Sequence, residues 1–345
     1  MKKVLFATTA LIATAGMAAA EVKVSGYGRF GLDWNEANGS NLLNNGQATS
    51  ETNITSRLRL QFDASTETDS GVTVGARIRA QAESRDGTPG GAVWSAPQFH
   101  VAYGGLRVNV GNIWGAIDSA PGLYLNTTSV GTGIDGMGFN SLATGNGFDW
   151  DTFTSAGAGR NGIEALYSAG GFSGHISYSQ SNTPAGTPGI TAGSADGLER
   201  TAIMLSYSFG DYFVTGAYQS EDNGRVVTKG AVSESAGDGL VFLAAGGDFG
   251  QFGATLSYAQ TEEADAVTLA GEAEIGAAST IVAWVNSTDV DTAVSAATQT
   301  RTDGTAFGIN YEYDLGGGVT FVAGYVNTAA ATDENSVQAG LHFSF

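Results

Sequence analysis

The chain has 345 residues, a formal net charge of −19 and no cysteine, so disulfides and thiolate metal sites are excluded. The acidic balance argues against nucleic acid as a partner, because binding phosphates needs clustered lysines and arginines. Beyond the N-terminal region, no segment reaches the ~18 consecutive apolar residues of a membrane-spanning helix, and no sustained helical periodicity is present.

Residues 1–20 are a predicted secretory signal peptide. A basic start, a mostly apolar stretch over residues 4–17 and three alanines precede Glu21. A membrane anchor helix is the alternative, but the apolar stretch is short and is interrupted by threonines. We therefore expect export of the chain, removal of residues 1–20 and a single domain over residues 21–345.

From Glu21 onward, apolar and polar side chains alternate in many short segments. Successive side chains of a strand point to opposite sides, so each segment is a predicted strand with one apolar and one polar face. The pattern is present in residues 22–34, 57–63, 72–81, 252–258, 307–313 and 319–325. In the last segment, Val337, Ala339, Leu341, Phe343 and Phe345 share the apolar face. The register near residues 280–286 stays open.

The connections between these segments are of two kinds. Seven are short and rich in Gly and Asp, as tight hairpins require, at 67–71, 104–105, 169–171, 210–211, 247–250, 272–276 and 314–318. Eight longer polar stretches lie near 35–53, 84–96, 112–161, 180–199, 220–238, 260–265, 287–304 and 328–336. Fifteen connections give sixteen strands. Short turns at one end and long loops at the other are typical of an outer-membrane barrel, with aromatic residues beside the short turns as a girdle.

A secreted β-sandwich or β-solenoid is the alternative fold. Either would need a second apolar face for a buried core. Here the second face carries Arg, Lys, Asp, Gln and Ser. We therefore predict an all-β fold, a 16-stranded antiparallel transmembrane β-barrel.

The chain resembles the general diffusion porins of Gram-negative outer membranes, most of all the alphaproteobacterial branch. The resemblance spans residues 21–345 and is carried by the opening Glu21–Gly26, the strands with Arg57–Leu60 and Gly75–Arg77, the turn Tyr313–Gly318 and the terminal Phe345. It implies a homotrimer of barrels in contact with outer-membrane lipid and lipopolysaccharide. It also implies an inward-folded third loop, a second loop (84–96) that latches onto a neighbouring subunit, and a terminal Phe recognised during assembly. The Pro-Glu-Phe-Gly signature of many enterobacterial third loops is absent.

The stretch over residues 112–161 is the longest connection and the predicted constriction loop. Structureless loops beyond ~15 residues are uncommon in compact domains and are often functional. Irregular backbone at membrane depth is tolerated only inside protein or along water, which favours the lumen over the outer mouth. The loop carries four candidate carboxylates, Asp118, Asp135, Asp149 and Asp151.

Six arginines lie on the polar faces of the early strands: Arg29, Arg57, Arg59, Arg77, Arg79 and Arg107. A hairpin centred on Thr68 would place Arg59 opposite Arg77 and Arg57 opposite Arg79. Directly opposed like charges destabilise a strand pair, so this ladder needs counter-charges or a use. Asp63 and Glu83 would supply some, and the acidic loop the rest.

These charges predict a constriction with arginines on the wall and carboxylates on the loop. A charged, narrow passage selects solutes by size and charge. Ordinary lumen-facing charge without a further role is the alternative. The net acidity favours cations in the loops and mouth, and the arginines oppose it at the narrowest point, so we expect a weak preference for cations.

Other signals point to no catalytic or cofactor site. Gly26–Gly31 spells a dinucleotide-binding motif, but no helix follows it. The three histidines lie on separate strands without a metal partner at i+2 or i+4. Residues 149–151 and 262–265 carry oxygen ligands suited to a structural Ca²⁺, but we favour the interpretation that they are solvated acidic loops. We expect no cofactor.

The sequence therefore predicts a passive, water-filled channel for small hydrophilic solutes and ions, and not an enzyme. Two other functions stay open at this point. One is an outer-membrane barrel enzyme such as a lipid hydrolase, and the other is a structural or adhesive barrel with a closed lumen.

Overall fold

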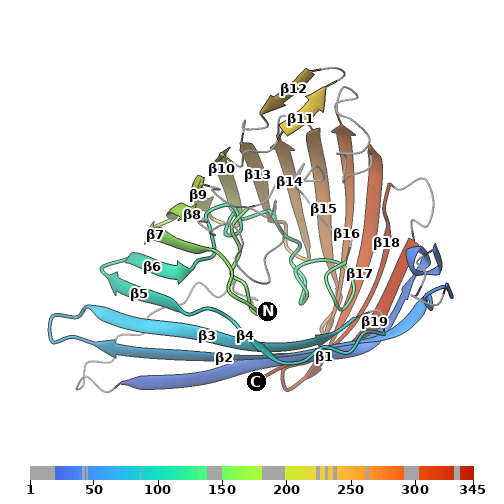
Figure 1. The fold of residues 1–345 in the computed structure, drawn as a ribbon, viewed down its shortest axis with the longest axis horizontal. Coiled ribbons are helices and arrows are strands. Elements are labelled where there is room, and N and C mark those ends of the chain that lie inside the picture. Colours follow the sequence, from blue (N-terminus) through green and yellow to red (C-terminus); the bar gives the residue numbers. More distant parts are fainter. Residues whose placement is uncertain are drawn as a thin grey trace.

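The computed structural model describes residues 20–40, 43, 46–85, 87–137, 150–180, 199–222, 226–229, 232–235, 239–261, 264–290, 303–329 and 335–345. Seventeen strands form one antiparallel sheet, and the first, β1 (Glu21–Asn35), pairs with the last, β19 (Asn335–Ser344). The sheet thereby closes into a barrel (Figure 1). One member, β4 (Val93–Trp94), has only two residues. The other sixteen form the wall and confirm the predicted strand number.

The wall strands between β1 and β19 follow one another around the barrel in chain order. They are β2 (Thr52–Glu67), β3 (Thr73–Ser84), β5 (Gln98–Tyr103), β6 (Leu106–Asn112), β7 (Asn161–Ala169), β8 (Phe172–Gln180), β9 (Glu199–Phe209), β10 (Tyr212–Asp222), β13 (Leu240–Asp248), β14 (Phe252–Gln260), β15 (Ala264–Gly276), β16 (Ser279–Val290), β17 (Gly304–Gly316) and β18 (Val319–Asn327).

Two small elements lie in the connections. A separate hairpin is formed by β11 (Val226–Lys229) and β12 (Val232–Ser235). The helical segment η1 (Glu36–Ser40) is a single 3₁₀ element. Among the described residues, no helix has the length and hydropathy needed to cross a membrane.

Side chains alternate between the two faces of the wall as predicted. The outer face exposes large apolar residues along its whole circumference, among them Val22, Ile54, Phe99, Leu256 and Val337. Aromatic residues beside the tight turns are also exposed, including Tyr103, Tyr207 and Phe252. In β16, the strand whose register stayed open, Val282, Trp284 and Asn286 are buried and therefore lie on the inner face.

One predicted turn is wrong. The turn expected at residues 272–276 lies at 277–278 instead, between β15 and β16. Gly276 is the last residue of β15, and the pairing with β16 shifts register between Glu274 and Gly276. A glycine near the end of a strand often marks such an irregularity rather than the turn itself.

The predicted register of the β2–β3 hairpin is also wrong, by four residues. The turn is closed by Thr68 N bonding Val72 O at 2.9 Å and by Gly71, whose φ of 82° a residue with a side chain rarely adopts. Opposite pairs are consequently Arg57 with Glu83, Arg59 with Gln81, Gln61 with Arg79 and Asp63 with Arg77. The shift is even, so every arginine keeps its predicted face while its partner changes.

The longest connection joins β6 to β7 over residues 113–160, and its described parts, 113–137 and 150–160, run inside the ring of strands (Figure 1). We call it the inner loop. Its Ile117 and Leu123 pack with inner-face residues such as Met204 and Phe242, and its Leu125 packs with Trp284. Full burial of one Leu or Ile side chain contributes about 1.5–3 kcal/mol. The inner face is thus apolar where the loop covers it. This differs from the prediction that the inner face is polar throughout.

Candidate functional site

Four partly exposed arginines line one side of the inner wall, on β2, β3 and β6. Arg57 forms an ion pair with Glu83 directly across the strand pair. Arg77 donates from Nε to Asp63 Oδ1 at 2.6 Å. These two arginines are therefore neutralised by carboxylates of the wall itself and not by the inner loop.

The other two arginines have neutral partners. Arg59 donates from Nε to Gln81 Oε1 at 2.7 Å and lies 4.9 Å over the ring of Tyr27. Arg107 donates from Nε to Asn109 Oδ1 at 2.7 Å. Among the described residues, the terminal nitrogens of Arg59, Arg77 and Arg107 make no hydrogen bond. In each of these three arginines, Nε donates a hydrogen bond to a wall residue, and the two terminal nitrogens remain available to water or solute.

Arg29 and Arg79 differ from these four because both are buried. Arg79 lies 5.0 Å from the ring centroid of Trp114 and 4.5 Å from that of Phe153, one at each end of the inner loop. It also donates from Nη1 to Ser155 Oγ at 3.0 Å. The two rings pack on each other at 5.2 Å between centroids, and a buried cation against such a ring pair gains cation–π stabilisation, so Arg79 holds both parts of the loop to β3.

The inner-loop carboxylates are mostly bound within the protein. Asp135 forms a buried ion pair with Arg29, at 2.7 Å between Oδ1 and Nη2. Asp151 forms a second buried ion pair with Arg200 of β9 at 3.3 Å. Asp149 lies outside the described residues. Of the four predicted carboxylates, the structure therefore places two in ties between loop and wall.

Asp118 is the partly exposed carboxylate of the loop. It accepts hydrogen bonds from Tyr124 Oη and from Trp150 Nε1. The surrounding loop and wall remove most of its water, and this burial raises the pKa of Asp118 to about 6, although the two hydrogen bonds act in the opposite direction. Burial also raises the pKa of Tyr124, so its hydroxyl stays protonated and donates.

The entry of the inner loop is fixed by the buried carboxylate of Glu164 on β7. Its Oε2 accepts from the backbone nitrogens of Trp114 and Gly115 at 3.1 and 3.0 Å and contacts His175 Nε2 at 3.0 Å. Its Oε1 accepts from Asn109 Nδ2 at 2.6 Å. A carboxylate this well satisfied holds the first turn of the loop against the wall.

Two wall carboxylates hold the middle of the loop on the far side of the barrel in strand order from the arginines. Glu272 of β15 accepts from Asn126 Nδ2 at 2.8 Å. Glu312 of β17 accepts from the backbone nitrogen and the hydroxyl of Thr128, both at 2.7 Å. Both carboxylates remain partly exposed. In strand order, the arginines thus lie on one side of the inner wall and these two carboxylates on the other.

Comparisons with known proteins agree with this architecture. The family model of the Gram-negative porins matches residues 7–333. The porin of Fuscovulum blasticum is 30% identical over 331 residues, covering 94% of this chain and all of that one. The porin of Rhodobacter capsulatus is 26% identical over 343 residues with the same coverage. A solved mutant of Rh. blastica porin superposes with a TM-score of 0.70 at 26% identity, covering 94% of this chain and 100% of that chain.

The chain belongs to the Gram-negative porin family. It is a multi-pass β-barrel of the outer membrane and a passive diffusion channel, not an enzyme. The exposed apolar face of the porin is accordingly its lipid-facing surface, as expected for strands that alternate between lipid and lumen.

Sequence reasoning missed several residues that fix the loop of this porin, above all Glu164, Glu272 and Glu312. The alternation around residues 307–313 placed Glu312 on the polar face, whereas Glu272 fell in the turn expected at residues 272–276 and Glu164 lies in a strand whose faces were not assigned. The sequence did not show which lumen residues the loop would reach. The signal that was available is the rarity of carboxylates on inner faces that are otherwise small or apolar.

The metal and hydrolase signals receive no support from the described part of the porin. His175 contacts Glu164, and His342 stacks on Tyr27 at 4.9 Å between ring centroids. No group of three or more His, Cys, Asp or Glu among the described residues is arranged to hold a metal. Asp149 and residues 262–263, which belong to the two acidic segments considered for Ca²⁺, lie outside the described ranges.

The raised pKa of Asp118 predicts a pH-dependent selectivity for this porin. The carboxyl is charged above about pH 6 and neutral below it, so acidification removes one negative charge from the lumen. We expect the ratio of cation to anion permeability to fall roughly 1.5- to 2-fold between about pH 7 and pH 5. Reversal potentials at a series of pH values measure this. Asp118→Asn should remove this part of the pH dependence, and an unchanged pH profile in the variant would contradict the assignment.

Proposed function

We propose that the inner loop narrows the lumen to a charged constriction. Its basic side is formed by Arg57, Arg59, Arg77 and Arg107, and its acidic side by Glu272 and Glu312. The observation that carries the proposal is the fastening of the loop to opposite sides of the wall, by Arg79 on one side and by Glu272 and Glu312 on the other. A loop held in this way keeps a fixed cross-section.

In this proposal the predicted constriction residues divide into two groups. The partly exposed arginines and Asp118 act on the passing solute. Arg29, Arg79, Asp135 and Asp151 position the loop, because their side chains are buried or in contact with loop and wall groups. A dipolar solute would orient between the two charged sides, and a large apolar solute would have to displace bound water. A weak preference for cations is expected from the net acidity of the chain.

Liposome swelling tests the constriction. Vesicles carrying the porin should swell in isotonic solutions of small sugars, and the rate should fall steeply as the size of the sugar increases. Arg79→Ala, which removes the contacts of Arg79 with both parts of the loop, should admit larger sugars than the wild type. Equal exclusion limits for both proteins would contradict a constriction formed by the loop.

We also propose a homotrimer whose lipid-facing surface contacts lipopolysaccharide in the outer leaflet. On the outer face, Leu32 and Ile54 are 60% and 69% exposed and line an open groove with Pro89 of the second loop. This is the loop expected to latch onto a neighbour. Native mass spectrometry of the detergent-solubilised protein should give three chains per particle, and a monomer would contradict the proposal.

A further inference from the structure

The closing seam of the barrel is the pairing of β1 with β19. It runs from Tyr27 opposite Ser344 to Asn35 opposite Ser336 without a register shift. Next to the pair of Tyr27 and Ser344, Gly26 and Phe345 exchange both backbone hydrogen bonds, at 2.9 and 3.0 Å. This is the one strand pair of the wall whose two members come from opposite ends of the chain, so no tight turn holds it together.

Residues 131–137 of the inner loop, which we call the tip, lie over this seam. The backbone carbonyl of Ile134 accepts from Arg29 Nη1 of β1 at 2.9 Å. The backbone nitrogen of Asp135 donates to Gln338 Oε1 of β19 at 2.9 Å. Two adjacent residues of the tip thus bond to the two strands that close the barrel.

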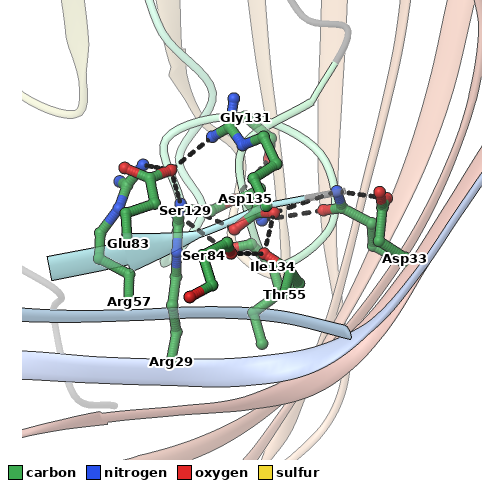
Figure 2. Close-up of polar contacts among 12 residues, drawn as sticks. Arg29, Asp33, Thr55, Arg57, Glu83, Ser84, Ser129, Gly131, Ile134 and Asp135 are labelled. Carbon is green, nitrogen blue, oxygen red and sulfur yellow. Dashed lines mark hydrogen bonds and ion pairs between the residues drawn. The ribbon is translucent and has the colours of Figure 1, made fainter. Parts of the chain in front are cut away.

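The carboxylate of Asp135 contacts side chains of three strands, β1, β2 and β19, at this point (Figure 2). It pairs with Arg29 of β1 at 2.7 Å and accepts from Thr55 Oγ1 of β2 at 2.6 Å and from Gln338 Nε2 of β19 at 3.4 Å. Gln338 Nε2 also donates to Asp33 of β1 at 2.8 Å, directly across the seam. The side chains of Arg29 and Asp135 are each 3% exposed, so water does not compete for these bonds.

The wall leaves room for the tip by using glycines. A Cβ on Gly340 of β19 would stand 2.6 Å from Ile134 Cδ1, and a Cβ on Gly324 of β18 would stand 2.3 Å from the nitrogen of Gly133. That nitrogen donates to Asn310 Oδ1 of β17 at 2.8 Å. Ile134 itself is 1% exposed. The tip therefore packs closely against the inner wall, in space that these glycines leave free.

We propose that the tip has a second function besides narrowing the pore: it staples the barrel seam shut from the inside. Arg29 and Asp135 are its central pair. Because they are buried and neutralise each other, they act on closure of the barrel and not on the charge that a solute meets. The loop is set in place by the same bonds that join β1 to β19, so pore shape and barrel closure depend on each other.

Amide hydrogen exchange of the full-length folded protein in detergent micelles tests the staple. In Asp135→Asn, peptides from β1 and β19 should exchange at least about tenfold faster than in the wild type, because removing one member of a buried ion pair strongly favours local opening. Thr55→Val, which removes one hydroxyl donor and should still fold, should give an increase of about two- to fivefold in the same peptides.

Asp151→Asn is the matched control. It breaks a second buried ion pair of the inner loop, whose wall partner Arg200 lies on β9, far from the seam. It should speed exchange near β9 and leave β1 and β19 unchanged. The proposal is overturned if Thr55→Val and any folded Asp135→Asn protein keep wild-type exchange at the seam, or if Asp151→Asn raises seam exchange equally.

Discussion

A variant in which Arg59, Arg77 and Arg107 are all replaced by glutamine should have a ratio of cation to anion permeability about three- to tenfold higher than the wild type. Each guanidinium keeps its terminal donors free, and at ~5 Å in a water-like medium a unit charge contributes roughly 0.8 kcal/mol to the energy of a passing ion, before screening by salt. With these three charges removed, Arg57, which is paired with Glu83, is the remaining arginine of the basic side opposite Glu272 and Glu312. The reversal potential of the porin in planar bilayers under a salt gradient measures the change.

The matched control for this variant replaces the same three arginines with lysine. It keeps the charges while losing the planar fork of donors, so the reversal potential should stay close to that of the wild type. The account of selectivity would be wrong if the glutamine variant, folded and conducting, had an unchanged reversal potential.

The second large effect is expected for Glu164→Ala. The substitution leaves His175, Asn109 and two backbone nitrogens without their buried acceptor, and removing one partner of such a buried network costs about 3–5 kcal/mol. The free energy of unfolding in denaturant should fall by this amount. The entry of the inner loop should also loosen, which should appear as increased noise in single-channel current.

Glu199→Ala provides the comparison for Glu164→Ala. Glu199 is exposed on β9, and a substitution at such a position is expected to change stability by no more than about 0.5 kcal/mol. If Glu164→Ala had the same free energy of unfolding and the same single-channel current noise as Glu199→Ala, the carboxylate of Glu164 would not be the anchor of the loop entry.

The strand number and the two faces of the wall could be predicted from the sequence because they depend on a period of two. An exposed Ile54 and a buried Thr55 follow from alternation alone, whatever their partners. The connections could be counted because Gly and Asp mark tight turns. The Ala277-Ala278 turn escaped because it contains neither residue.

Partners across strands were harder to predict, because they depend on the position of each turn to the residue. Centring the first hairpin on Thr68 paired arginine with arginine, whereas the actual turn pairs Arg57 with Glu83 and Asp63 with Arg77. The predicted electrostatic conflict in the wall therefore does not exist between β2 and β3. Arg29 does lie opposite Arg57, and Glu83 contacts both.

The contacts of the inner loop could not be read from the sequence at all. Asp135 is separated from Gln338 by about two hundred positions, and nothing local distinguishes it from Asp118, which keeps partial exposure. Which carboxylate becomes a tie and which faces water is decided by the path of the loop over the wall. That path follows apolar contacts such as Ile117 and Leu123, whose inner-face partners are spread over several strands.

The central claim is that the wall arginines face the conducting path, and a single introduced cysteine tests it most directly. The chain has no cysteine, so Arg107→Cys gives one reactive thiol against an inert wild type. A cationic thiosulfonate reagent should restore the reversal potential toward the wild-type value, and an anionic one should raise the preference for cations further. If mass spectrometry shows the thiol modified while conductance and reversal potential stay unchanged with both reagents, the claim is contradicted.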